Sequence, residues 1–312
     1  MRESELHQHI RDRSRGLTGS FPRILVGPGD DAAVVRAGDD APLLAVTVDQ
    51  LIEGRHYEPR RLESPEGRDL VARKAIARSI SDLAAMAAAP HWSLATAALP
   101  RSFKHADDLF DRMARWASHW QCPLVGGDIA ATDGPLTLTV TAAGGFADTP
   151  GARGPVLRSH AKPGDLVCVT GALGGSLESE HHLRFEPRLS EAAWLARTLG
   201  PHLGAMIDLS DGLGRDAARL ADASGVRIEL DADRLPPRRP GLTLESMLGD
   251  GEDYELCFTL RPDAERSLPP TSPETRVPFT IVGRVLGPGE GPACTVRRGD
   301  DRLDASRLGW DH

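Results

Sequence analysis

Residues 207–213 read IDLSDGL, which places two carboxylates, Asp208 and Asp211, on either side of the Ser210 hydroxyl beside an apolar stretch. We expect a helix over 211–223, opened by the sequence Ser-Asp-Gly. A carboxylate beside an apolar stretch is partly shielded from water, and burying an unpaired carboxylate costs much free energy. The same context recurs at Gly29-Asp30-Asp31, Thr47-Val48-Asp49, Ser81-Asp82-Leu83 and Gly126-Gly127-Asp128. The recurrence predicts that these carboxylates have partners.

Hard divalent cations are the natural partners for these carboxylates. The chain has only three lysines, although its arginines are plentiful, and Mg²⁺ prefers oxygen ligands while retaining waters and substrate phosphates. Any single Asp in such a turn is more often a turn residue or a helix cap. Five such positions beside apolar segments favour instead a site that binds several metal ions.

Three other phosphate- or metal-binding motifs fit poorly. Residues 27–32 match the dinucleotide pattern GxGxxA, but the seven or so residues between the flanking strands are too few for a crossover helix. No Gly-Lys-Ser/Thr occurs, which excludes a P-loop. An EF-hand placed on Gly212 would need Ile207 as its first ligand. A bound nucleotide would therefore be held by metal ions and backbone N–H groups.

Length and composition indicate an ordinary globular protein. The 312 residues suggest two domains, and the net charge of −8 argues against non-specific nucleic-acid binding. No apolar run is long enough to span a membrane, and the charged beginning of the chain does not resemble a secretory signal. The four cysteines form no CxxC pair. We therefore expect a cytoplasmic protein with neither membrane nor nucleic-acid partners.

Alternating and helical periodicities predict a mixed α/β (α+β) fold. Helices are expected over 3–16, 66–88, 105–120, 191–199 and 211–223, and strands over 43–49, 93–98, 136–143, 166–170, 226–230, 254–260 and 279–285. The Gly- and Pro-rich stretch 144–154 is the expected boundary. It divides the chain into domains 1–148 and 149–312.

Motifs across nearly the whole chain resemble, in order, those of the thiamine-monophosphate kinase family. They are GPGDDAAVV (27–35), TVDQLIEGRHY (47–57), KAIARSISDLAAMAAAP (74–90), LVGGD (124–128), RSHAKPGDLVCVTGALGGS (158–176), IDLSDGL (207–213), ASGV (223–226), GEDYELCFT (251–259) and GWDH (309–312). The resemblance implies the two-domain fold of aminoimidazole ribonucleotide synthetase. In that fold the N-terminal domain forms the homodimer and carries ATP and metals, and an α/β C-terminal domain lies beside it.

The resemblance also implies the reaction and the residues of the site. ATP and thiamine monophosphate would give thiamine diphosphate and ADP, with several Mg²⁺ ions and often K⁺. The implied metal ligands are Asp31, Asp49, Asp82, Asp128, Asp208 and Asp211, helped by Asp30 and Thr47; Gly127, Asp128, Arg158 and Ser210 would contact ATP, and His56, Glu252 and Trp310 the thiamine side. No general base is expected, because the acceptor phosphate is already ionised at neutral pH.

Three places depart from the family pattern. Asp250 replaces a glycine, residues 129–135 are longer and less polar, and the segment 174–182 is short. These changes leave two alternatives open. One is a related ATP-dependent enzyme of the superfamily with a different acceptor, and the other is a regulatory protein that binds Mg–ATP without turnover.

Overall fold

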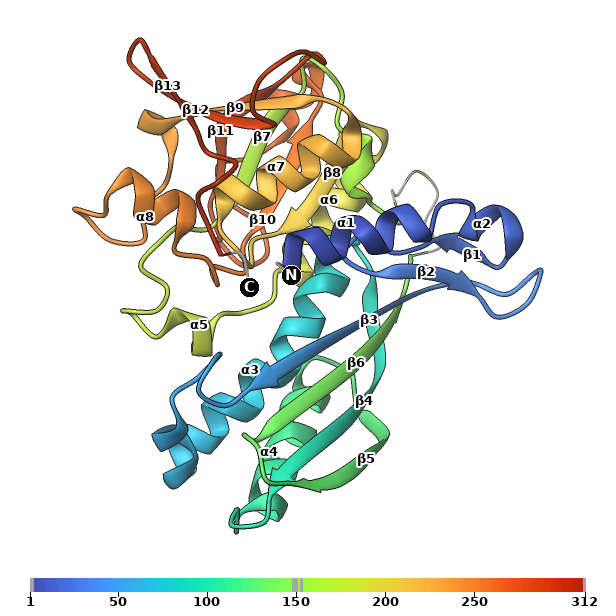
Figure 1. Ribbon diagram of the computed structural model, residues 1–312. Helices are drawn as coiled ribbons and strands as arrows, with labels where there is room; N and C mark the ends of the chain where they lie inside the picture. The colour runs from blue at the N-terminus through green and yellow to red at the C-terminus, as the bar shows by residue number, and fades with distance from the viewer. Residues whose placement is uncertain (1–2, 148–150, 152–153, 311–312) are drawn as a thin grey trace.

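The computed structural model describes residues 3–147, 151 and 154–310, and consists of two mixed sheets with helices packed on them (Figure 1). The first half of the chain contains α1 (Glu3–Arg13), α2 (Leu17–Ser20), β1 (Ile24–Val26), β2 (Ala33–Arg36), β3 (Leu43–Ile52), α3 (Pro65–Ala85), β4 (Ala89–Pro100), α4 (Ala106–His119), β5 (Leu124–Thr132) and β6 (Thr137–Gly145). The second half contains β7 (Leu166–Thr170), α5 (His181–Arg184), α6 (Leu189–Leu199), β8 (Leu203–Asp208), α7 (Leu213–Ser224), β9 (Arg227–Asp231), α8 (Leu244–Gly249), β10 (Leu256–Leu260), β11 (Phe279–Leu286), β12 (Cys294–Arg298) and β13 (Asp301–Asp304). Short 3₁₀ turns connect several of these elements.

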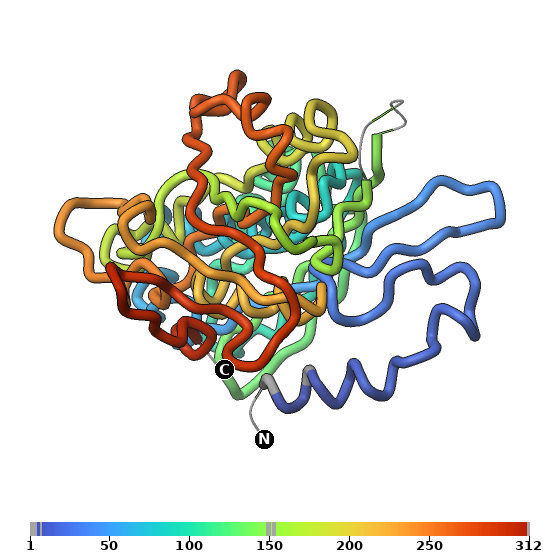
Figure 2. Tube along the Cα trace, turned by 90° about the horizontal axis from the view of Figure 1, so that it is seen from above, coloured from blue at the N-terminus to red at the C-terminus, as the bar shows by residue number. Residues whose placement is uncertain are grey.

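The first sheet has the strand order β1-β2-β3-β6-β4-β5, in which only the β4–β5 pair is parallel. Helices α3 and α4 lie behind the sheet, and no described helix lies over its front face along β3, β6, β4 and β5 (Figure 1). Strands β1 and β2 and helix α2 extend to one side of the molecule (Figure 2).

Helix α3 begins sharply because Ser64 caps it and Pro65 occupies its first turn. The Ser64 hydroxyl accepts a hydrogen bond from the Gly67 backbone N–H at 3.0 Å. Most of the helix is buried, including Ile76, Ile80 and Leu83, so it forms the centre of the first core rather than a surface layer.

The second sheet has the order β13-β12-β9-β11-β7-β10-β8 and is antiparallel except between β12 and β9. One core lies beneath α7, and another beneath α6 also contains Ala84 and Ala85 at the end of α3. Helix α3 therefore packs against both halves of the chain. No described helix is long and apolar enough to cross a membrane.

The mixed α/β architecture predicted from the sequence is confirmed, with differences in detail. The helix expected over 66–88 is α3, which ends at Ala85. Strand β8 was not predicted, although all six of its residues are buried and it delivers Asp208. A half-buried strand is recognised by alternating apolar and polar residues, and the continuous apolar run of β8 lacks this alternation. The GGD motif (126–128) lies inside β5.

An aspartate-lined cleft between the two halves of the chain

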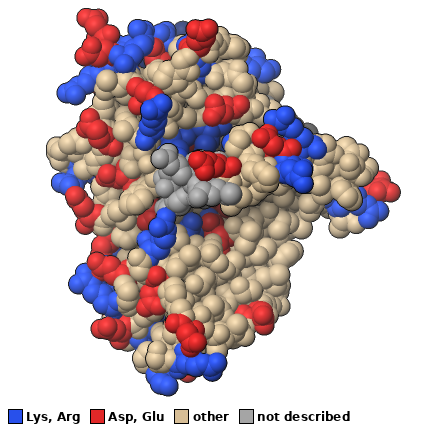
Figure 3. Space-filling model, viewed as in Figure 1, with Lys and Arg blue, Asp and Glu red and all other residues tan. Residues whose placement is uncertain are grey.

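A cleft of about 1020 Å³ is lined by residues from both halves of the chain. Acidic and basic side chains meet in this hollow (Figure 3). Of the predicted site residues, those that line it are Asp30, Asp31, Thr47, Asp49, His56, Asp82, Arg158, Ser210, Asp211, Glu252 and Trp310. Asp208 lies beside them, within the group of three aspartates described next.

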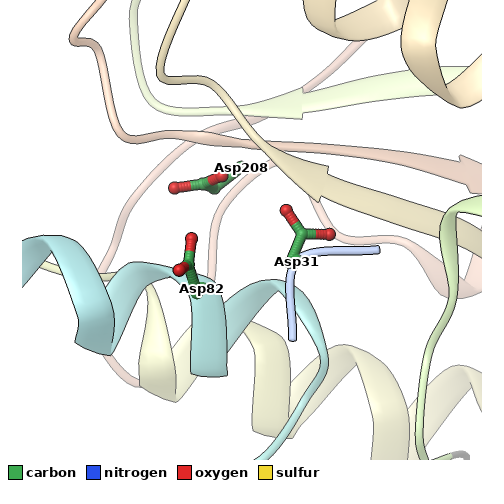
Figure 4. A group of neighbouring side chains, drawn as sticks. All are labelled: Asp31, Asp82 and Asp208. Carbon is green, nitrogen blue, oxygen red and sulfur yellow. The ribbon is translucent and has the colours of Figure 1, made fainter. Parts of the chain in front are cut away.

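Asp31, Asp82 and Asp208 form the centre of the site. They come from the turn before β2, from α3 and from the end of β8, and their side chains point toward one another (Figure 4). One carboxylate oxygen from each lies within 4.8 Å of the other two. Asp31 and Asp208 are buried and Asp82 is partly buried. Three elements distant in sequence thus bring three carboxylates into one small volume.

Each of these carboxylates is held in place by a neighbouring side chain. The Ser81 hydroxyl donates to Asp208 at 2.6 Å, and the Thr47 hydroxyl donates to Asp82. Arg158 forms a two-pronged pair with Asp31, with Nε at 3.0 Å from Oδ2 and Nη2 at 2.7 Å from Oδ1. The orientation of the carboxylates is therefore fixed before any ligand arrives.

The pKa values of the cluster show that it is short of positive charge. Burial and then the neighbouring carboxylates, chiefly Asp49 and Asp208, raise the pKa of Asp82 well above its ordinary value. Burial and Asp31 do the same for the pKa of Asp208. Burial and Asp31 also raise the pKa of Asp30 to about 7. Like charges repel in this poorly solvated site, so a bound cation would reduce the repulsion between the carboxylates. The oxygen-only donor set fits Mg²⁺.

Two further predicted ligands stand at the rim of the cluster, each beside an arginine. Asp49 on β3 lies 3.2 Å from Arg78 Nη2, and Asp211 lies 2.5 Å from Arg219 Nη1. The cleft therefore holds guanidinium groups next to carboxylates. Carboxylates suit metal ions and guanidinium groups suit phosphate oxygens, so the arrangement fits a metal–phosphate ligand.

Asp216 was not singled out from the sequence, yet it shapes the loop that carries Asp211. Its Oδ2 accepts hydrogen bonds from the backbone N–H groups of Asp211 at 3.0 Å and Gly212 at 3.2 Å. Gly212 itself has φ of 118°, and a Cβ there would lie 2.7 Å from the Leu248 carbonyl oxygen. The sequence signal for this role is an acidic residue in the first turn of α7.

The other end of the cleft is organised by Lys74, which sequence reasoning also missed. Its side chain is fully buried, and Nζ donates to both Glu252 oxygens at 2.7 and 2.8 Å and to the His56 carbonyl at 2.8 Å. Trp310 is 47% exposed, and its indole N–H donates to the Asp250 carbonyl at 2.7 Å. Lys74 thus joins two of the residues assigned to thiamine, His56 and Glu252, whereas the Trp310 backbone N–H donates to the Asp211 carbonyl at 3.0 Å.

Gly127 and Asp128 do not join the other predicted residues. The register of the first sheet places Asp49 opposite Val140, Val140 opposite Ala95, and Ala95 opposite Gly127. Three strand spacings of about 4.8 Å separate Asp49 from Gly127, roughly 14 Å. A Cβ at Gly127 would lie 1.8 Å from the Ala95 carbonyl oxygen, so the glycine also serves strand pairing. Both residues are exposed and neither lines the cleft.

Two departures from the family pattern contact each other. The Asp250 carboxylate accepts from the Gly175 N–H at 2.8 Å and from the Ser246 hydroxyl. The Asp250 carboxylate is therefore hydrogen-bonded to the segment 174–182, and Asp250 does not line the cleft.

Comparison with known proteins agrees with this geometry. Residues 29–146 match the AIR synthase related protein N-terminal domain, and residues 162–292 match the corresponding C-terminal domain. A thiamine-monophosphate kinase of Rhodopirellula baltica is 37% identical over 290 residues, covering 88% of this chain and 87% of the relative.

Two solved structures extend the comparison. Thiamine-monophosphate kinase from Stenotrophomonas maltophilia superposes with a TM-score of 0.68 at 31% identity, covering 91% of this chain and 94% of that one. AaThiL complexed with AMPPCP and TMP gives a TM-score of 0.76 at 28% identity, covering 100% and 99%. Fold, cleft and sequence agree, and the chain belongs to the thiamine-monophosphate kinase family within the AIR synthase related proteins.

Proposed function

We propose that this chain transfers the γ-phosphoryl group of ATP to thiamine monophosphate, giving thiamine diphosphate and ADP, with Mg²⁺. The observation that carries the proposal is the convergence of Asp31, Asp82 and Asp208 within 4.8 Å at the centre of a large cleft. The kinase names of the relatives and the ATP analogue and TMP in AaThiL support the choice of substrates.

The metal ions would be held by Asp31, Asp82 and Asp208, with Asp49 and Asp211 at the rim. Asp30, partly buried, also lines the cleft and accepts from the Arg158 backbone N–H at 3.2 Å. When bound, Mg²⁺ supplies positive charge that neutralises the phosphates of donor and acceptor and aligns them. The hydroxyls of Thr47 and Ser81 keep the carboxylates oriented, as described above. Ser210 and Arg158 line the same region and are the proposed ATP contacts.

The acceptor needs orientation rather than deprotonation. A phosphate monoester has a second pKa near 6, so its attacking oxygen is already ionised at pH 7. The main obstacle is repulsion between two polyanions, which positioning and fixed positive charge overcome. At the thiamine end, Glu252 provides a carboxylate for the cationic ring system and Trp310 an aromatic face. His56 is fixed there by its ring Nδ1, which accepts from the Ile52 N–H at 2.9 Å.

We further propose that the protein acts as a homodimer and that Gly127 and Asp128 serve the cleft of the second copy. The uncovered face and edge of the first sheet expose Val48, Val125 and Ile129, between 62% and 70% accessible. Figure 3 shows a broad, nearly uncharged area over these strands. An apolar area of this kind is typical of a protein interface. Because Asp128 is remote from its own cleft, a partner is the remaining way for it to reach a site.

The remaining expectations also enter this proposal. A domain boundary between residues 148 and 149 is supported by the two sheets, which end at Gly145 and begin again at Leu166. Residues 148–150 themselves lie outside the described residues. A cytoplasmic location and a K⁺ requirement stay predictions.

The decisive experiment is the formation of thiamine diphosphate from ATP and thiamine monophosphate, followed by chromatography. We expect product only with Mg²⁺, none with EDTA, and a response to added K⁺. ATP-analogue binding without turnover of thiamine monophosphate would instead favour another acceptor, such as an amide or carboxylate oxygen. Binding of Mg–ATP without ADP release for any acceptor would indicate a regulatory protein.

A further inference from the structure

Three residues of α3 form a stripe along one face of the helix, and two of them, Arg78 and Asp82, line the cleft. Lys74, Arg78 and Asp82 are spaced by four positions, which places them on one helix face at intervals of about 5–6 Å. Lys74 binds Glu252 at the thiamine end, and Asp82 belongs to the metal cluster. Arg78 therefore lies between the two ends of the site, where nothing in the predicted site provides a positive charge.

The guanidinium of Arg78 is anchored but not saturated. Nη1 donates to the Gln50 carbonyl at 2.7 Å, and Nη2 lies 3.2 Å from Asp49 Oδ1. Among the described residues, Nε is buried and has no hydrogen-bond partner. The side chain is 16% exposed and lines the cleft. A guanidinium that is fixed in place and lines a cleft is suited to a phosphate oxygen.

The order along the helix matches the order along the acceptor. In thiamine monophosphate the phosphate lies between the thiamine rings and the incoming γ-phosphoryl group. Glu252 and the metal cluster occupy the two ends, so the acceptor phosphate must sit opposite the middle of the stripe. Asp49 does not prevent this, because a carboxylate can accept from Arg78 with one oxygen and ligate a metal with the other.

We propose that Arg78 binds the phosphate group of the acceptor, and so lets the site distinguish a phosphorylated substrate from the unphosphorylated alcohol. The inference rests on the proposed function, and it adds a residue and a source of specificity to it. Its contribution should appear in the phosphate-dependent part of binding alone, because Arg78 lies one helical turn from both Lys74 and Asp82.

The test compares thiamine monophosphate with thiamine. Calorimetric titrations are made with Mg²⁺ and a non-hydrolysable ATP analogue present, using wild type, Arg78→Met and Arg78→Lys. Arg78→Met should weaken thiamine monophosphate binding by about 10- to 100-fold, the range for a lost hydrogen bond to a charged group, and leave thiamine binding unchanged. Arg78→Lys, which keeps the charge, should recover part of the loss.

A matched control is Arg234→Met, because Arg234 is 60% exposed and pairs with Asp231 on the surface of the second half. It should bind both compounds as wild type does. Unaltered ATP-analogue affinity in Arg78→Met would show that the metal cluster is intact. If wild type phosphorylates thiamine monophosphate but Arg78→Met keeps the same preference over thiamine, this inference is wrong and the proposed function stands. If wild type does not bind thiamine monophosphate, both fail.

Discussion

At Asp82, burial and three neighbouring carboxylates act in the same direction, and all of them disfavour the ionised form. The pKa of this carboxyl is raised mainly by burial, then by Asp49, Asp208 and Asp31. The unfolded chain releases this proton near pH 4, whereas the folded chain retains it to higher pH. Stability is therefore lost as pH rises above about 4. The aspartates destabilise the metal-free protein.

Asp82→Asn should separate function from stability. We expect turnover to fall by about 10³-fold or more, because a ligand to phosphate-bound metal is lost. In EDTA at pH 7 the variant should melt a few degrees higher than wild type, since Asn needs neither a bound proton nor a buried charge at this position. Mg²⁺ should stabilise wild type more than the variant. Differential scanning calorimetry measures the two changes in melting temperature, and the thiamine diphosphate assay measures turnover.

The control for this variant is Asp133→Asn, whose carboxylate is 98% exposed. It should leave Tm and turnover unchanged. A variant at Asp82 that melts lower than wild type in EDTA would show that the cluster is not mutually repulsive.

Lys74 gives the thiamine end its own pH dependence. Burial lowers the pKa of Lys74 to about 8, although Glu252 opposes this effect. Because the folded value lies below the unfolded value, the unfolded chain binds the extra proton between about pH 8 and 10.5. Lys74 therefore makes the fold more stable as pH rises across this interval, while its ion pair with Glu252 is lost.

Loss of that ion pair should appear in substrate affinity. KM for thiamine monophosphate should rise above about pH 8 in wild type, because an unprotonated Lys74 no longer holds Glu252 in place. Lys74→Arg stays charged, so its KM should not show this rise. Steady-state kinetics between pH 7 and 9 provide the measurement, with KM for ATP as the internal reference. The same rise in both proteins would assign the effect to another group.

The sequence was most informative at the residue scale for aspartates and least informative for their partners. Asp31, Asp82 and Asp208 were predicted to meet because each follows or precedes an apolar segment, and they do meet. Lys74 was not predicted, because its partner Glu252 is 178 residues away. A buried lysine inside an apolar helix carries no local signal of what it binds.

Among the structural elements, the loop 251–255 contacts both halves of the chain. Glu252 pairs with Lys74 of α3, while Asp253 and Glu255 are buried ion pairs within the second half. Tyr254 stacks on Phe185. The motif GEDYE therefore provides structural ion pairs as well as the proposed substrate contact of Glu252, and its composition alone did not separate these roles.

The Glu255 pair predicts a specific pattern of stability. Arg188 donates to both Glu255 oxygens at 2.6 Å, and the Thr170 hydroxyl donates to Oε2 at 2.7 Å. Arg188→Met should destabilise the fold by about 3–5 kcal/mol, because it leaves a buried charge unpaired. The double variant Arg188→Met/Glu255→Gln should recover much of that loss. Urea unfolding measures both, and a double variant no more stable than Arg188→Met alone would contradict this account.

Elements with strong periodicity were predicted better than those without it. Helix α4 was expected at 105–120 and spans 106–119, since its apolar and polar residues segregate clearly. Strand β8 was missed because a short, continuously apolar segment reads equally as helix or strand. The β5 register was also beyond the sequence, since it depends on pairing with β4.

For the whole molecule, the position of Asp128 decides between a self-sufficient chain and a shared site. Asp208 is buried at the cleft, whereas Asp128 is exposed on β5 and remote from it. If a second copy covers the first sheet, each site would combine Asp208 of one chain with Asp128 of the other. A closed two-fold dimer would then contain two such composite sites.

Mixing two inactive variants distinguishes these arrangements. Asp128→Asn and Asp208→Asn should each lose most activity as homodimers. After co-expression, half of the dimers should be mixed, and one of their two sites should carry both native aspartates. Activity should therefore return to about a quarter of the wild-type value, the statistical limit for a two-fold dimer. A self-sufficient chain would give no recovery, because every cleft would then lack one aspartate, and the exposed sheet face would need another explanation.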